Sequence, residues 1–73
     1  MDKADSAVWG FLRHRWDSAY LFEYDSTPGE SKPFRVRRRD DLTRMLEAET
    51  PDQLGHMIDE DYLREPVPRE VAS

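Results

Sequence analysis

The stretch YLFEYDSTPGESKPFRVRR, residues 20–38, decides the fold of this chain. Both of its ends, residues 20–24 and 34–38, alternate apolar and polar side chains, a period of two that is typical of strands with one buried face. The segment between them is a loop by composition, and Pro28-Gly29 marks a turn inside it. The stretch therefore predicts an antiparallel β-hairpin with an aromatic inner face.

The side-chain pattern also predicts the register of this hairpin. Residues directly opposite each other share a face, so apolar side chains must meet apolar side chains. This condition pairs Tyr24 with Phe34 and Phe22 with Val36. The same register places Glu23 opposite Arg35 on the solvent face, where opposite charges attract.

A helix is expected before the hairpin. Asp5 or Ser6 offers an N-cap, and the helix should end near Asp17 or Ser18. Its apolar residues recur at helical spacing: Val8, Trp9, Leu12, Trp16 and Ala19. Trp16 is expected in the core, because it is in phase with the others and lies just before the aromatic strand.

Two further helices are expected after the hairpin. Asp40 and Asp41 offer a cap and first-turn acids for the first of them, which should end by Ala48 or Glu49. Its apolar residues are Leu42, Met45 and Leu46.

The capping signal for the last helix is Thr50-Pro51-Asp52-Gln53, with a cap, a proline at the first helical position and a capping-box glutamine. The apolar residues behind it are Leu54, Met57 or Ile58, and Tyr62. Pro66 and Pro68 should end this helix.

The predicted fold is a small single α+β domain in the order α-β-β-α-α, with the hairpin packed against the helices. Residues 1–65 form this domain, and residues 66–73 are expected to be a flexible C-terminal tail. A chain of 73 residues leaves no room for a second domain. It has no cysteine, which excludes disulfides and a thiolate zinc site. With no apolar leader and no long apolar run, we expect a cytoplasmic protein.

One string of residues resembles a group of short, uncharacterised actinobacterial proteins. It runs from Trp16 and Ala19-Tyr20 through the Arg37–Asp40 end of the hairpin to Thr50-Pro51, Asp61-Tyr62 and Pro66-Val67-Pro68. The resemblance covers residues 9–68. It implies a bacterial source, and it implies no activity.

Charge is distributed unevenly along the chain. The net charge is −5, yet residues 32–39 carry five basic side chains and no acid. We take Arg35, Arg37, Arg39 and Lys32 as the candidate partner-binding residues. The three arginines alternate along the strand, so their side chains should project from the same outer face. The other interpretation is that these arginines pair internally with Glu23 and the acidic helices.

No motif points to catalysis or to a cofactor. The chain has three glycines and two histidines, and it lacks a nucleophile elbow or a phosphate loop. His56 with Asp59 and Glu60 shares one helix face and could in principle hold a cation, but a solvated face is the ordinary explanation. His14 lies between two arginines and is expected at the surface. We therefore expect no enzyme, no metal and no cofactor.

The sequence favours a non-catalytic protein-interaction module or small regulatory protein with a protein partner. One alternative is a nucleic-acid-binding accessory protein that uses the hairpin arginines. Another is an acidic inhibitor or nucleic-acid mimic that uses the last predicted helix. No membrane partner is expected, and the oligomeric state stays open.

Overall fold

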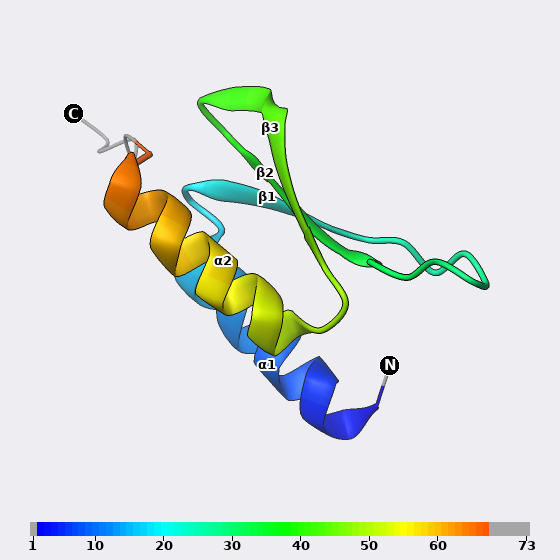
Figure 1. The fold of residues 1–73 in the computed structure, drawn as a ribbon. Helices are drawn as coiled ribbons and strands as arrows, with labels where there is room; N and C mark the ends of the chain where they lie inside the picture. The colour runs from blue at the N-terminus through cyan, green and yellow to red at the C-terminus, as the bar shows by residue number, and fades with distance from the viewer. Residues whose placement is uncertain (1, 68–73) are drawn as a thin grey trace.

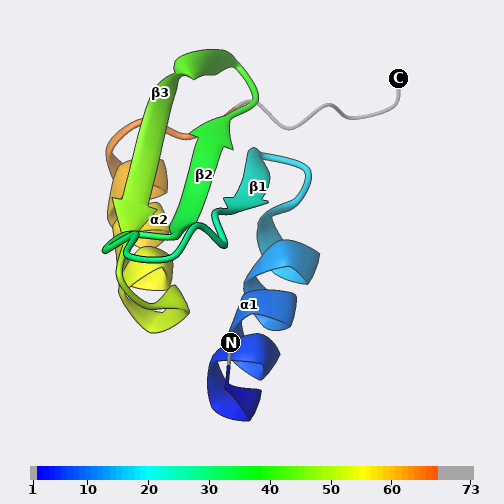
Figure 2. The same ribbon diagram turned by 90° about the vertical axis from the view of Figure 1, so that its right-hand side faces the viewer.

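The computed structural model describes residues 2–67 as two helices and one three-stranded sheet. The elements follow in the order α1 (Lys3–Trp16), β1 (Tyr20–Tyr24), β2 (Phe34–Arg38), β3 (Asp41–Ala48) and α2 (Pro51–Arg64). The sheet is antiparallel, in the order β1-β2-β3. Both helices lie on one side of it (Figure 1), while its other face is left uncovered by the described chain (Figure 2). The prediction of a small α+β domain is confirmed, but the order is α-β-β-β-α.

The register of the β1–β2 hairpin is the predicted one. Tyr24 lies opposite Phe34, Phe22 opposite Val36, and Glu23 opposite Arg35. The side chains of Phe34 and Val36 are buried against the helices, so the alternating pattern does define the inner face.

The prediction of a helix from Asp40 or Asp41 to Ala48 is wrong, because these residues form β3. The helical interpretation used Leu42 and Met45 as buried positions, yet they are 51% and 39% exposed. The alternate residues Leu46 and Ala48 face the core instead, opposite Val36 and Phe34. Intrinsic helix propensity is worth only a few tenths of a kcal/mol per residue, so pairing with the open edge of β2 prevails.

A bulge makes this strand hard to recognise in the sequence. Arg37 pairs with Met45 while the next residue, Arg38, pairs with Asp41, so three residues of β3 loop out of the ladder. The Asp41 carboxylate accepts hydrogen bonds from both the backbone N–H and the hydroxyl of Thr43, which hold this bulge. The interruption breaks the period of two that marks an ordinary strand.

Helix α1 starts earlier than expected. The cap is Asp2, whose carboxylate accepts a hydrogen bond of 2.8 Å from the Asp5 N–H, and neither Asp5 nor Ser6 is the cap. The helix ends at Trp16, with Asp17 as its C-cap, as the spacing indicated.

Helix α2 confirms its capping signal. The Thr50 hydroxyl accepts a hydrogen bond of 3.2 Å from the Gln53 N–H, and Pro51 occupies the first helical position. The Gln53 side chain reaches back to the Glu49 N–H, one residue before the cap. Within residues 2–67, no helix is long and apolar enough to cross a membrane.

The core lies between the helices and the sheet. Trp16 is buried, as predicted, and its ring contacts those of Tyr20 and Tyr62. Trp9 packs edge-on against Phe22 and Phe34. The buried apolar residues are Leu12, Trp16, Ala19, Tyr20, Phe34, Val36, Ala48, Leu54, Ile58 and Val67.

The chain stays attached to the core beyond the end of α2. Val67 is only 2% exposed, although it falls within the predicted tail at residues 66–73. The rest of that predicted tail, residues 68–73, lies outside the described residues.

Candidate functional site

The four candidate residues, Lys32, Arg35, Arg37 and Arg39, which we call the basic stripe, lie on the central strand and just beyond its ends. Arg35 and Arg37 alternate with the buried residues of β2, so they project from the face of the sheet opposite the core. Arg39 follows the end of β2, and Lys32 lies in the loop before it. The predicted alternation therefore holds for the two residues within the strand.

Arg35 lies among three carboxylates. Its guanidinium nitrogens are 3.0 Å from Asp25, 3.1 Å from Glu30 and 3.0 Å from Glu47. The positive field of Arg35 helps to hold the pKa of Asp25 below its usual value, after the larger effect of the hydrogen bonds from Thr27. Two of these acids, Asp25 and Glu30, lie in the loop between β1 and β2, and Glu47 lies on β3.

The other two arginines also have carboxylate partners. Arg37 donates a hydrogen bond of 2.7 Å to Glu23, a diagonal neighbour, so Glu23 binds Arg37 although it lies opposite Arg35. Arg39 bridges to the carboxylate of Asp17 at the end of α1. Among residues 2–67, the Lys32 side chain forms no ion pair. The three arginines are thus neutralised within the domain, which favours the internal-pairing interpretation.

Arg38 occupies the opposite face of β2 and is 1% exposed. Its Nε and Nη2 donate to the two carboxylate oxygens of Asp40, both at 2.9 Å. Its Nη1 donates to Asp61 at 2.9 Å and to the backbone carbonyl of Glu65 at 2.7 Å. These charge-assisted bonds, those to Asp40 foremost, raise the pKa of Arg38 and lower that of Asp40.

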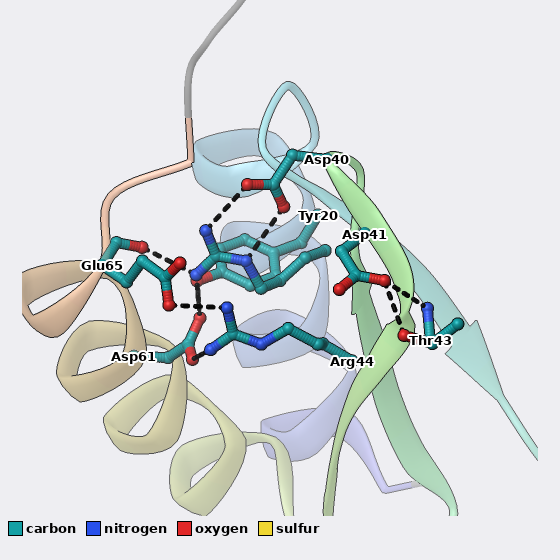
Figure 3. A network of polar contacts seen from close by, with 8 residues as sticks. Tyr20, Asp40, Asp41, Thr43, Arg44, Asp61 and Glu65 are labelled. Carbon is teal, nitrogen blue, oxygen red and sulfur yellow. Dashed lines mark hydrogen bonds and ion pairs between the residues drawn. The ribbon is translucent and has the colours of Figure 1, made fainter.

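The carboxylate of Asp61 is the meeting point of three side chains (Figure 3). One of its oxygens accepts a bond of 2.6 Å from the Tyr20 hydroxyl as well as the bond from Arg38. Its other oxygen accepts from Arg44, which also binds the Glu65 carboxylate at 2.6 Å. Burial, and then the bond to Asp61, raises the pKa of Tyr20.

We call Arg38, Tyr20, Asp40, Asp61 and Arg44 the arginine network. Its polar atoms are taken up by one another: no buried side-chain nitrogen or oxygen in the described part of the chain lacks a hydrogen-bond partner. This set joins strands, turn and helix, while the side chain of Arg44 stays 40% exposed and that of Asp40 33% exposed.

Sequence reasoning missed the role of Arg38, although a signal was present. The alternation that places Phe34 and Val36 inward also places Arg38 inward, opposite Tyr20. Composition alone grouped it with the solvent-facing arginines of the stripe. A buried arginine requires carboxylates, and Asp40 stands two residues further along the chain.

A groove of about 410 Å³ lies between the middle of α1 and the first turns of α2. One stripe from each helix lines it, and most of the lining is apolar. Phe11 stands beside the groove with 61% of its surface exposed, although the next residue, Leu12, is buried. The lining residues are Ala7, Val8, Phe11, Leu12, Pro51, Asp52, Gly55, His56 and Asp59.

Close helix packing forms the floor of the groove. Gly55 faces Leu12, and a Cβ atom at Gly55 would lie 3.2 Å from Leu12 Cδ2. The glycine lets the helices approach here, while Phe11 and Val8 form the wall on the side of α1. We call these lining residues together the α1–α2 groove. Sequence patterns did not predict it, since Phe11 is out of phase with the core residues.

The two histidines lie apart from each other. His56 lines the α1–α2 groove, and His14 is exposed on α1. Within residues 2–67 there is no cluster of three or more histidine, aspartate or glutamate side chains placed to hold a metal ion.

Comparison with known proteins identifies no relative. No family model matches the chain, and no curated protein or solved structure matches it significantly. The resemblance to short actinobacterial proteins therefore stays a prediction, and function is argued from geometry alone.

The raised pKa of Tyr20 predicts a loss of stability at alkaline pH. The folded domain holds the neutral phenol, so this stabilisation is complete below the unfolded pKa of about 10 and falls as pH rises toward the folded pKa. The free energy of unfolding, measured by urea denaturation, should decline above this pH in the wild type and decline less in Tyr20→Phe. Equal alkaline slopes for the two proteins would contradict the assignment.

Internal pairing of the stripe predicts that reversing it destabilises the fold. Arg35→Glu/Arg37→Glu places new carboxylates among the existing acids, so the melting temperature should fall, and high salt should restore part of the loss. The control Lys32→Glu/Arg13→Glu makes the same change in net charge at side chains without an ion pair in the described residues. If Arg35→Glu/Arg37→Glu lowers the melting temperature no more than this control does, the two arginines are available to a partner.

Proposed function

We propose that this chain is a non-catalytic protein-interaction module, and that the α1–α2 groove holds a segment of a partner protein. The observation that carries the proposal is the exposed Phe11 beside an apolar groove. Burying one such side chain contributes about 1.5–3 kcal/mol, which makes Phe11 a suitable centre for an interface.

The shape of the groove supports a polypeptide as its occupant. Its length on α2, from Pro51 to Asp59, is about 12 Å at the rise of an α-helix, or about two helical turns. Its floor is apolar, and its polar groups stand along one side. A groove between two helices with this lining suits the helix-in-groove mode of peptide recognition.

The arginine network supports the non-catalytic part of the proposal. Tyr20 and Arg38 both donate to Asp61, and Arg38 also donates to the backbone carbonyl of Glu65, so these hydrogen bonds serve the fold. The nucleic-acid alternative receives no such support. A phosphate at Arg35 would have to displace three carboxylates of the same chain.

The proposal predicts that Phe11→Ala weakens partner binding and leaves the fold intact. Because Phe11 is exposed, its truncation should change the free energy of unfolding by less than about 0.5 kcal/mol. Affinity for the partner should fall at least about tenfold, equivalent to about 1.4 kcal/mol. The control is Leu63→Ala, which truncates an 82% exposed side chain of α2 outside the groove.

The partner can be identified by photo-crosslinking in the native host. A photoreactive phenylalanine analogue replaces Phe11 in one protein and Leu63 in the other. The purified partner is then titrated with wild type, Phe11→Ala and Leu63→Ala. Binding that is equally strong with all three, or adducts that form only at position 63, would overturn the groove as the docking site.

A further inference from the structure

The two walls of the α1–α2 groove differ in polarity. The wall from α1 presents Ala7, Val8 and Phe11. On α2, the polar lining residues Asp52, His56 and Asp59 recur at i, i+4 and i+7, so they form one stripe along the helix. An occupant of the groove therefore meets apolar side chains on one side and carboxylates on the other.

The carboxylates of this stripe have no basic side-chain partner in the described residues, although Asp52 lies in the first turn of α2, where the helix dipole favours an acid. Neither Asp52 nor Asp59 forms an ion pair in residues 2–67, and the groove lining contains no lysine or arginine. Other acids contrast with them, since Glu47, Asp61 and Glu65 all bind arginines. The negative charge of the groove wall is thus left for a ligand of opposite charge.

On the basis of the proposed interaction function, we infer that the occupant is a basic amphipathic helix of a partner protein. Its apolar stripe packs against α1 and the groove floor, and its lysine or arginine side chains face Asp52 and Asp59. These two acids are seven residues apart, about 10 Å along α2. The matching cations therefore stand at i and i+7 of the partner helix, on one flank of its apolar stripe.

A second copy of this chain does not fit these requirements. A two-fold contact through the groove would bring the same acids of two chains together, and each chain carries a net charge of −5. Neither helix offers two cations seven residues apart: α1 carries Lys3, Arg13 and Arg15, and α2 carries Arg64. The occupant is accordingly a different chain.

The test uses the full chain, labelled with ¹⁵N, and three synthetic helical peptides. The first carries an apolar stripe with arginines at i and i+7 on one flank. The second has glutamates at those two positions, and the third has the two arginines moved to the side opposite the apolar stripe. Amide shifts give the site and the affinity for each peptide.

The protein variants isolate the acidic stripe. Asp52→Asn/Asp59→Asn should bind the first peptide roughly threefold to tenfold more weakly, as expected for two partly exposed charge pairs. Glu49→Gln/Glu60→Gln removes the same charge from exposed positions outside the groove and should bind it like the wild type. Thermal melting of each variant checks that the fold is retained.

The expected result is that all shifts fall on groove amides such as those of Ala7, Phe11 and Gly55, that the first peptide binds more tightly than the other two, and that only the groove variant loses affinity for it. Equal binding of the first and second peptides would overturn the charge requirement while leaving the interaction function standing. Equal binding of the first and third would overturn the one-sided arrangement. Shifts that grow with protein concentration alone would indicate a second copy, and a groove unaffected by every peptide would also overturn the inference. The crosslinking experiment judges the interaction function separately.

Discussion

The buried guanidinium of Arg38 is the constraint on which the rest of the structure depends. A charge that is 1% exposed is tolerated only when its donors are satisfied, and Asp40, Asp61 and the Glu65 carbonyl satisfy them. These partners lie in the β2–β3 turn, in α2 and at its C-terminal end. Tyr20 adds β1 through Asp61. One side chain thus fixes the position of α2 on the sheet and the path of the chain beyond it.

This network divides the domain into two unlike ends. At the C-terminal half of α2, Asp61 and the following Glu65 bind arginines of the sheet, and Val67 is buried in the core. At its N-terminal half, Leu54 and Ile58 anchor the helix to the core, while the side toward α1 remains an open apolar groove. The proposed binding surface therefore includes one helix, α2, that the network attaches to the sheet, and a second helix, α1, that packs against it at Gly55.

Sequence patterns predicted the parts of this fold that depend on local signals. The alternation in residues 20–38 sufficed for the hairpin register, and Thr50-Pro51 sufficed for the start of α2. Residues 41–48 have helix-forming composition and a bulge, so only the open edge of β2 makes them a strand. The α1–α2 groove could not be predicted, because it arises from two helices distant in sequence that meet at Gly55. Arg38 was readable from the alternation but not from composition.

A double-mutant cycle between Arg38 and Asp61 tests the central claim most directly. The free energies of unfolding of Arg38→Met, Asp61→Leu and the double variant are measured by urea denaturation, with a stabilising osmolyte in all samples. Each single substitution should cost about 1–3 kcal/mol, because it removes one charge-assisted bond while Arg38 keeps Asp40 and Asp61 keeps Arg44. The double variant should cost clearly less than the sum of the two single substitutions, because both remove the same bond. Additive losses in the double variant would contradict the claim that this pair fixes α2 on the sheet.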